Sequence, residues 1–295
     1  MLKTIDTIFA KKQYMICFPN AKINLGLNIV SRRPDGYHNL ETIFYPIELK
    51  DGLEIIPNEC KSTSNAYRLY QTGIHIKGND SNNLVIKALE LIKRHTDKTV
   101  PNIDIHLLKK IPSEAGLGGG SSNAAFMLKL LNESFSLGFT ADKLIKLASQ
   151  IGADCPFFIY NQPAFATGIG ENLEPININL DDKYLVVVKP NISVSTKDAF
   201  SMITPKQPDI SLKVIVKSPV TEWKKLMKND FELPIFKKYP EICNIKQQLY
   251  DNGAVYAAMS GSGSSVFGIF ENKPRLNQLF ETQFTWYSTP ISKNY

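Results

Sequence analysis

The strongest constraint on the fold is the run GLGGGSSN at residues 116–123. Residues 103–107 before it alternate between apolar and polar, as a β-strand does, and residues 124–131 after it place apolar side chains on one helical face. Small residues let the backbone approach an anion closely, and the free N–H groups of the first helical turn point toward that anion. The run therefore predicts a phosphate-binding loop between a strand and a helix.

This loop matches neither of two common nucleotide-binding fingerprints. No Gly-Lys pair follows, as G-x-x-x-x-G-K-[ST] requires, and Ser121 stands where G-x-G-x-x-G needs its third glycine. A tight turn that only joins a strand to a helix would explain one or two glycines, but here four glycines are followed by two serines. We therefore favour phosphate binding over a purely structural turn.

Periodic patterns elsewhere in the chain mix strands with helices. Residues 14–30 alternate in the manner of a strand, which is expected to end at the turn RPDG at 33–36, and Ser81-Asn82 is expected to cap the helix that follows. Further strands are expected over 42–47, 73–77, 103–107 and 184–188, a hairpin over 254–270, and helices over 124–131, 144–151 with Gly152 as the C-cap, 221–229 and 241–251. The predicted fold class is therefore α+β.

The length of the chain suits two domains. At roughly 150 residues per domain, 295 residues correspond to about two. The strand at 184–188 begins the second half, and a boundary is expected near 165–182. We expect an N-terminal domain at 1–165, which contains the glycine loop, and a C-terminal domain at 166–295.

Net charge and composition limit the classes of molecule that this protein is expected to bind. The net charge of +6 is spread over short doublets such as Lys109-Lys110 and Lys237-Lys238, which suits a small phosphorylated ligand better than a nucleic acid. The apolar stretch 184–188 is far shorter than the roughly 18 residues of a membrane span, and residues 1–14 lack the apolar region of a secretory signal. Four cysteines without a C-x-x-C pair indicate neither zinc nor disulfides. We expect a cytoplasmic protein that binds no membrane and no nucleic acid.

Three polar residues outside the loop are candidates for catalysis. Lys22 and Asn24 share one face of the first predicted strand, although a solvated sheet face would show the same pattern. Asp154 lies just past a predicted helix end, between Gly152 and Pro156, where the side chain can point into a cleft. Phosphoryl transfer needs a carboxylate to orient or deprotonate the attacking hydroxyl, and a cation to support it. Lys22 and Asp154 would supply those two groups.

A second small-residue segment, MSGSGSS at 259–265, lies between strand-like segments. Such a hairpin is common and often inert, so by itself it indicates little. It could also approach the glycine loop across a cleft.

Five motifs together resemble the 4-diphosphocytidyl-2-C-methyl-D-erythritol kinases, a family of the GHMP kinase superfamily. In chain order they are PNAKINL at 19–25, RPDGYH at 33–38, GLGGGSSNAA at 116–125, GADCPFF at 152–158 and SGSG at 260–263. They follow the family's order from about residue 14 to 270 and so cover most of the chain. The D-G-Y-H element distinguishes this family from the galactose, homoserine and mevalonate kinases.

The resemblance implies a two-domain GHMP kinase-like fold with a catalytic cleft between the domains. Asp154 would be the base and Lys22 its partner, and Mg²⁺ would accompany ATP, with the metal ligands left open. The residues implied for ATP are Pro112, Ala115, Gly116, Leu117, Gly118, Gly119, Gly120, Ser121 and Ser122. Those implied for the substrate are Asn24, Tyr37 stacked on cytosine, His38 hydrogen-bonded to it, and, on a looser local match, Phe200 as a second stacking ring with Thr196 nearby.

The implied reaction is ATP-dependent phosphorylation of the 2-hydroxyl of 4-diphosphocytidyl-2-C-methyl-D-erythritol, in the methylerythritol phosphate pathway to isoprenoid precursors. The alternatives are another GHMP kinase of mevalonate, homoserine or sugar type, and a non-catalytic nucleotide-binding homologue. A binder would not need Lys22 and Asp154, which counts against the last. Glu114 departs from the family, which commonly has glycine there, and is left out of the site because a carboxylate would oppose phosphate. We expect a monomer or a weak homodimer.

Overall fold

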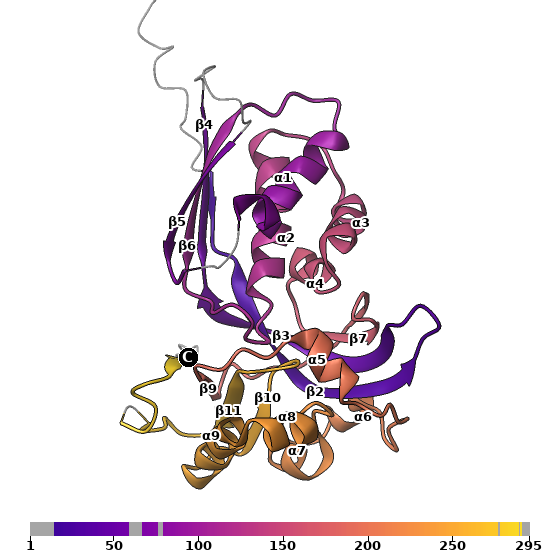
Figure 1. Cartoon of the computed structure of the whole chain (residues 1–295), viewed down its shortest axis with the longest axis vertical. Coiled ribbons are helices and arrows are strands. Elements are labelled where there is room, and N and C mark those ends of the chain that lie inside the picture. Colours follow the sequence, from indigo (N-terminus) through magenta and orange to yellow (C-terminus); the bar gives the residue numbers. More distant parts are fainter. Residues whose placement is uncertain (1–14, 59–66, 76–78, 277, 289, 291–295) are drawn as a thin grey trace, which may run out of the picture.

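The computed structural model describes residues 15–58, 67–75, 79–276, 278–288 and 290. Two lobes lie one above the other, with a sheet of long strands running between them (Figure 1). Residues 1–14, which include the first residue of the predicted strand 14–30, and Cys60 lie outside the described residues.

The upper lobe is a sheet with helices on one face (Figure 1). Its strand order is β1-β4-β6-β5, in which only β5 and β6 run parallel. The elements are β1 (Ile16–Cys17), β4 (Gly52–Pro57), β5 (Tyr67–Gly73), β6 (Ile103–Lys109), the 3₁₀ turn η1 (Asp80–Asn82), α1 (Leu84–Arg94), α2 (Gly119–Ser134), α3 (Ala141–Ile151) and α4 (Cys155–Tyr160). The predicted apolar stripes of α1 and α2 are confirmed, because Val85, Ala88, Leu89, Ile92, Ala124, Met127, Leu128 and Leu131 share one core with β6.

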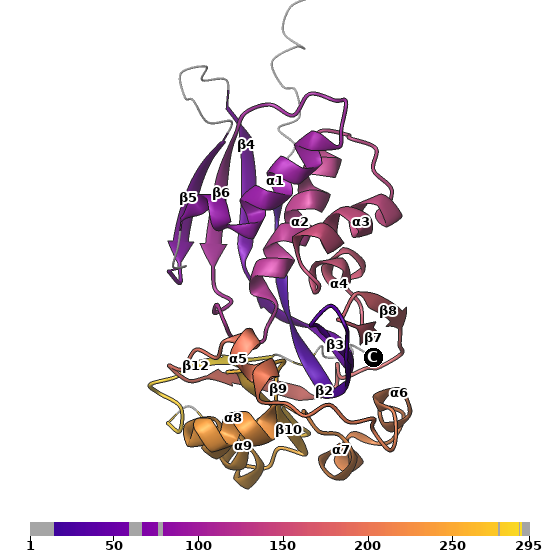
Figure 2. The same ribbon diagram turned by 45° about the vertical axis from the view of Figure 1, so that its right-hand side comes forward.

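The middle sheet joins the two lobes. Its antiparallel order β2-β3-β7-β8 is formed by β2 (Asn20–Arg32), β3 (His38–Lys50), β7 (Ala164–Gly168) and β8 (Asn172–Pro175), and Figure 2 shows β7 and β8 at one end of it. Position 165, where the first predicted domain ends, lies inside β7, and the sheet continues to Pro175. The end of β8 therefore falls within the predicted boundary region 165–182.

The lower lobe is an antiparallel sheet of order β10-β11-β9-β12 with helices around it. The elements are β9 (Tyr184–Lys189), β10 (Tyr256–Met259), β11 (Val266–Phe270), β12 (Phe284–Tyr287), α5 (Thr196–Ser201), α6 (Leu212–Ile215), α7 (Val220–Leu226), α8 (Glu232–Lys238) and α9 (Pro240–Asp251). The strand at 184–188, the helix at 241–251 and the hairpin of β10 and β11 confirm the sequence analysis. Apolar side chains of β2 and β3 share one hydrophobic core with β9, β10 and β11. The middle sheet therefore packs against the sheet of the lower lobe.

Three local expectations were wrong at their boundaries. The strand expected over 73–77 ends at Gly73, which has φ +82° and pairs with Lys109, the last residue of β6. The Ile74 N–H still donates to the Lys109 carbonyl at 2.9 Å, but the ladder goes no further in the described residues, and Ile76 and Lys77 lie outside them. The cap of α1 is Asn83, whose Oδ1 accepts the Val85 N–H at 3.0 Å. The helix expected over 221–229 ends at Leu226, because Met227 is extended.

Candidate active site

Lys22 is a buried lysine on β2 that faces a cleft. The apolar neighbours Ala21 and Ile23 point into the core of the lower lobe, so strand alternation turns Lys22 and Asn24 the other way. Lys22 is 3% exposed; its Nζ donates to Asn24 Oδ1 at 2.6 Å and lies 5.0 Å from the centre of the Phe44 ring. The expectation that Lys22 and Asn24 share a face is confirmed, and that face is a cleft wall.

Asp154 meets Lys22 from the upper lobe. It follows α3 and caps α4, whose first turn contains proline, so the backbone there is restrained. The Lys22 Nζ lies 3.5 Å from Asp154 Oδ2, and the Asp154 side chain is 33% exposed while that of Lys22 is nearly sealed. Burial lowers the pKa of Lys22 and Asp154 opposes that shift. The pair thus combines a sheltered cation with a carboxylate that a ligand in the cleft can reach.

The glycine loop forms the next part of the cleft. Gly116 and Gly118 line it and have φ of +71° and +69°, a backbone that favours glycine. The helix α2 begins at Gly119, with Gly118 as its N-cap, so the free amides of its first turn lie at the loop. The predicted order of strand, glycine loop and helix is confirmed.

The segment Ser260–Ser265 joins the glycine loop from the lower lobe. Ser260 Oγ donates to the Gly116 carbonyl at 2.8 Å and accepts the Asn24 N–H at 3.2 Å. The Ser265 N–H donates to the Ala115 carbonyl at 3.2 Å. The possible approach of the two small-residue loops is therefore realised. Asn229, which the sequence analysis missed, donates from its Nδ2 to the carbonyls of Met259 and Gly261, both at 2.8 Å.

The cleft has a volume of about 1140 Å³ and takes its walls from both lobes and the middle sheet. The predicted residues that line it are Lys22, Asn24, Tyr37, His38, Gly116, Gly118, Asp154, Thr196 and Phe200. The other predicted loop residues lie outside this lining: Pro112, Ala115, Leu117, Gly119 and Ser122 are buried, Ser121 is half-buried and Gly120 is exposed. Lining residues that the sequence analysis missed include Val194, Ser195 and Phe231, which carry no motif.

The turn after β2 brings aromatic groups to the mouth of the cleft. Tyr37 is 61% exposed. The His38 ring is stacked on Phe200, with 5.0 Å between ring centres and 18° between planes, and Phe200 in turn packs edge-on against Phe231. Desolvation, together with the nearby Arg32, lowers the pKa of His38. This shift favours the neutral imidazole, which can both donate and accept a hydrogen bond.

Glu114, which the sequence analysis left out of the site, is among the residues that line the cleft. It lines the cavity with φ +50°, in the left-handed region where glycine is most at ease. Burial lowers the pKa of Lys189, and the negative charge of Glu114 partly opposes that shift.

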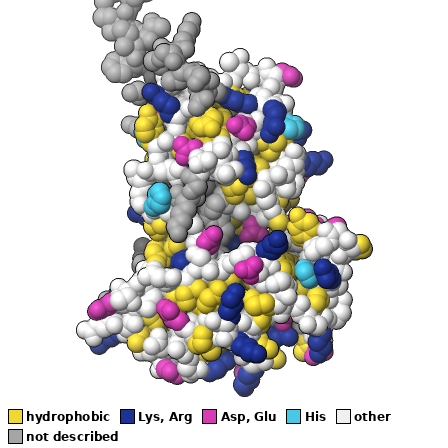
Figure 3. Space-filling model, in the orientation of Figure 1, with side chains coloured by type: hydrophobic (Ala, Val, Ile, Leu, Met, Phe, Trp, Pro, Cys, Tyr) yellow, Lys and Arg dark blue, Asp and Glu magenta, His cyan; other side chains and the backbone are white. Residues whose placement is uncertain are grey.

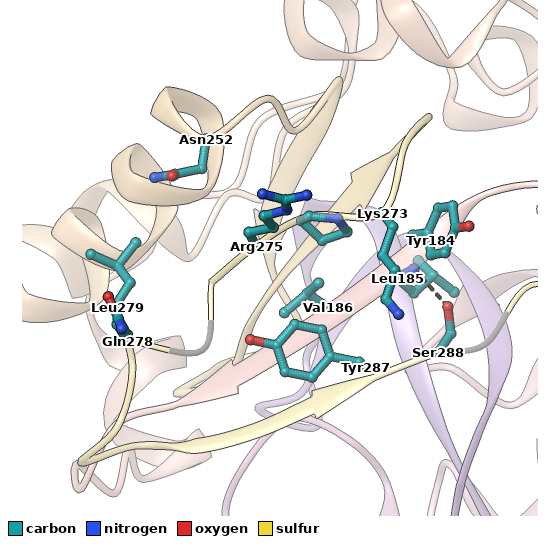
Figure 4. A pocket seen from close by; sticks show the side chains of 11 residues that line it. Tyr184, Leu185, Val186, Asn252, Lys273, Arg275, Gln278, Leu279, Tyr287 and Ser288 are labelled. Atoms are coloured by element: carbon teal, nitrogen blue, oxygen red, sulfur yellow. Dashed lines mark hydrogen bonds between the residues drawn. The ribbon is translucent and has the colours of Figure 1, made fainter.

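A second cavity, of about 1020 Å³, lies in the lower lobe (Figure 4). Its lining comes from β9, β12, the end of α9 and the segment after β11, and includes Lys273, Arg275 and two tyrosines. Among the described residues that line it there is no carboxylate to accept the proton of a substrate hydroxyl, and no glycine loop to bind phosphate. We therefore place the chemistry in the cleft between the lobes.

Two surface features bear on the partners. Figure 3 shows lysines and arginines scattered over the visible face and interspersed with acidic side chains, without a basic stripe. Within the described ranges, no helix is both long and apolar enough to cross a membrane.

Comparisons with known proteins agree on one family. The family model for the N-terminal domain of GHMP kinases matches residues 83–162, and that for the C-terminal domain matches residues 211–282. A Parabacteroides distasonis protein named 4-diphosphocytidyl-2-C-methyl-D-erythritol kinase is 56% identical over 274 residues, which cover 92% of this chain and 98% of that protein. A Bacteroides fragilis protein of the same name is 55% identical over 272 residues, 92% of this chain and 97% of the relative.

Solved structures show the same fold. A crystal structure of 4-(cytidine 5'-diphospho)-2C-methyl-D-erythritol kinase has a TM-score of 0.78 and 31% identity, covering 92% of this chain and 97% of the other. A homoserine kinase from Cytophaga hutchinsonii has a TM-score of 0.67 at 17% identity, with coverage of 95% and 96%, and shares the fold.

Proposed function

This chain belongs to the GHMP kinase family, and from that membership we propose that it phosphorylates the 2-hydroxyl of 4-diphosphocytidyl-2-C-methyl-D-erythritol with ATP. The observation that carries the proposal is the Lys22–Asp154 pair, which faces the glycine loop across one cleft. The product would serve the methylerythritol phosphate pathway to isoprenoid precursors. The residues that line the cleft come from segments before and after the link between β8 and β9 in the sequence. We propose that the two domains divide at this link, between Pro175 and Tyr184.

Asp154 is proposed as the base. Its exposed carboxylate would accept the proton of the 2-hydroxyl as the hydroxyl oxygen attacks the γ-phosphorus of ATP. The bond from that phosphorus to the β,γ-bridging oxygen breaks, and ADP leaves with the electron pair. Lys22, held by Asn24 at 2.6 Å, would keep the carboxylate in place and offset the charge that develops nearby.

The glycine loop is proposed to bind the phosphates. The amides of the first turn of α2 and the positive end of its dipole favour an anion there. A magnesium ion usually binds one or two carboxylates together with substrate phosphates and water, and Glu114 is a carboxylate of the cleft lining that would be available to it. When bound, Mg²⁺ would neutralise phosphate charge. Among the described residues no cluster of three or more metal-ligating side chains forms a cage of its own.

The aromatic groups at the cleft mouth are proposed to bind cytosine. Tyr37 and Phe200 would stack on the base and His38 would hydrogen-bond to it, with Thr196 beside them on α5. The His38 ring covers one face of Phe200, so a base that stacks on that face would replace the imidazole. The exchange of one stacked ring for another keeps that face of Phe200 covered.

The test is a substrate panel. The purified protein is incubated with ATP, Mg²⁺ and either the cytidine compound, its uridine analogue, mevalonate or homoserine, and ADP release and the phosphorylated product are measured. We expect turnover with the cytidine compound alone, because a pocket built to hydrogen-bond one base rejects another by a large factor. Equal use of both bases would remove the cytidine specificity, and turnover of mevalonate or homoserine would favour the other GHMP kinases. Tight ATP binding without any turnover would favour a non-catalytic homologue.

A single substitution tests the stacking residue. Tyr37→Ala should remove about 1 to 3 kcal/mol of binding free energy for the cytidine substrate, the magnitude of base–aromatic stacking. ATP affinity should remain unchanged, as measured by calorimetry. Exposed Tyr160→Ala, outside the cleft lining, is the matched control, and an equal loss there would point to a general effect.

Location and assembly follow from the same proposal. Both substrates are charged phosphate compounds of the cell interior, so we propose a cytoplasmic enzyme. We also propose a monomer or a weak homodimer. Sedimentation over a range of concentrations, alongside activity, would test this.

A further inference from the structure

Asp51 is a fully buried carboxylate at the link between β3 and β4 and is not among the residues that line the cleft. The residue is 1% exposed, and its own N–H donates to the Pro19 carbonyl at 2.8 Å. A buried carboxylate is costly unless its oxygens are fully hydrogen-bonded. The hydrogen-bond donors to the Asp51 carboxylate therefore indicate its role.

Four donors converge on the Asp51 carboxylate. Oδ1 accepts the backbone N–H groups of Lys110 at 2.7 Å and Ile111 at 2.9 Å. Oδ2 accepts from Asn123 Nδ2 at 2.8 Å and from the ammonium of Lys109. Lys109 Nζ also donates to Asn123 Oδ1 at 2.9 Å, which closes a three-membered network of side chains.

These partners stand on both sides of the glycine loop. Lys109, Lys110 and Ile111 lead from β6 into it, whereas Asn123, the last residue of the run GLGGGSSN, lies in the second turn of α2. One carboxylate therefore holds the entry and the exit of the loop together. The Lys109 Nζ would lie 3.4 Å from a Cβ placed on Gly119, so the network sits directly beneath the first turn of α2.

Stability alone is a poor reason for this arrangement. Well-packed apolar side chains of similar volume often stabilise a core as well as or better than a buried ion pair does. What a polar network adds is fixed geometry, because each donor and acceptor must keep its direction. Here that geometry spans the two stems of the loop whose amides receive the phosphates.

We propose that Asp51, Lys109 and Asn123 form a loop clasp that positions the phosphate-binding amides of the glycine loop. The inference rests on the proposed function only in that ATP phosphates bind this loop. The three are positioning residues, since they act through the backbone and do not line the cleft. The clasp should therefore affect the phosphates of the nucleotide and leave its nucleoside untouched.

The main test is Asn123→Ala, which removes the tether to α2 but leaves the Asp51–Lys109 pair intact. Dissociation constants of the variant are measured by calorimetry for ATP, ADP and adenosine. We expect the constants for ATP and ADP to rise about ten-fold, because preorganised phosphate contacts are lost, and that for adenosine to stay within two-fold. Leu131→Ala, a fully buried change two turns further along α2, is the matched control. It should lower the melting temperature with no selective loss of ATP.

A second variant separates hydrogen bonding from charge. In D51N/K109M the amide oxygen can still accept from Lys110 and Ile111, and the amide nitrogen can donate to Asn123. We expect ATP affinity within about three-fold of the wild type, a rescue relative to Asn123→Ala. Equal weakening of ATP and adenosine by Asn123→Ala, or an ATP loss in Leu131→Ala of the same size, would overturn the clasp. Because ATP binding is measured without the alcohol substrate, a failure of the substrate assignment would leave this result readable.

Discussion

In the described part of the chain, two buried lysines, Lys22 and Lys109, each pair with an aspartate, and the two pairs differ in what surrounds the carboxylate. In the cleft, Lys22 and Asp154 are 3.5 Å apart and the Asp154 side chain is 33% exposed. Beneath the glycine loop, the side chains of Lys109 and Asp51 are 3% and 0% exposed, and both carboxylate oxygens accept two hydrogen bonds. An open carboxylate can take a proton from a ligand, whereas a saturated one can only hold its partners. The same pair of residue types thus serves chemistry in one place and geometry in the other.

The largest effect is expected at the open pair. Asp154→Asn keeps the shape of the side chain but removes the base, so kcat should fall about 10²- to 10⁴-fold while the dissociation constant of ATP stays within a few fold. Steady-state kinetics and calorimetry measure the two. A variant that keeps a tenth or more of the wild-type kcat would remove Asp154 from the proposed role.

Removing the carboxylate of the Asp51–Lys109 pair should lower the stability of the protein. Asp51→Ala leaves the Lys109 ammonium buried without its carboxylate, which should cost about 3 to 5 kcal/mol of the free energy of unfolding. Urea denaturation followed by circular dichroism measures it. Asp154→Ala is the matched control and should cost much less, because water can reach that site. Equal costs would mean that the two pairs do not differ as described.

Substitutions at the neighbouring Gly118 and Gly119 should have different kinetic effects, because Gly118 lies next to the Lys22–Asp154 pair and Gly119 next to the Asp51–Lys109 pair. A Cβ on Gly118 would lie 2.9 Å from the Phe158 ring and 3.3 Å from Lys22 Cε, in a left-handed backbone, whereas one on Gly119 would lie 2.8 Å from Ile111 Cγ2 and near Lys109. Gly118→Ala should cost about 1 to 2 kcal/mol of stability from its backbone alone and should lower kcat.

Gly119→Ala should instead mainly weaken ATP binding, through the clasp. Gly138→Ala, in a left-handed backbone outside the cleft lining, is the control for backbone strain alone. Identical kinetic profiles for Gly118→Ala and Gly119→Ala would contradict the separation.

The smallest effect expected is on the pH profile. Burial lowers the pKa of Lys22, so its charged form prevails below that lowered pKa and is lost as the pH rises through it. If the ammonium supports Asp154, kcat should decline on the alkaline side at a pH where exposed lysines are still charged. Lys22→Arg should move this decline to higher pH, because arginine stays protonated. If the kcat of the wild type stays constant up to the ordinary pKa of lysine, the charge of Lys22 does not determine the rate.

Local patterns predicted the parts of the site that depend on neighbouring residues. The alternation around Lys22 and Asn24 identified their common face, because a strand has a period of two. The glycine run identified the loop and the start of α2, because few other residues adopt that backbone. The order of the five motifs, from PNAKINL to SGSG, indicated the family, which the comparisons confirm.

Patterns failed where the outcome depended on a partner strand or a distant segment. The strand expected over 73–77 had the right alternation but ends where its neighbour β6 ends. Position 165, the predicted domain boundary, lies inside β7, and the pairing that places β7 in the middle sheet is a long-range contact that local patterns do not contain. Asn229 and Asp51 escaped notice since a single polar residue between apolar segments carries no signal until its donors and acceptors are known.

The amino-acid sequence by itself determined which chemical groups are available and which local backbone each can adopt: a phosphate-sized glycine turn, a lysine on a strand face and an aspartate after a helix. Only the tertiary structure decided which aspartate faces which lysine, and how much water reaches each pair. Burial and hydrogen-bond saturation depend on segments tens of residues apart, such as Asp51 and Lys109, that meet only when the sheets and helices pack. That difference in solvent access separates a proposed base from a proposed clasp.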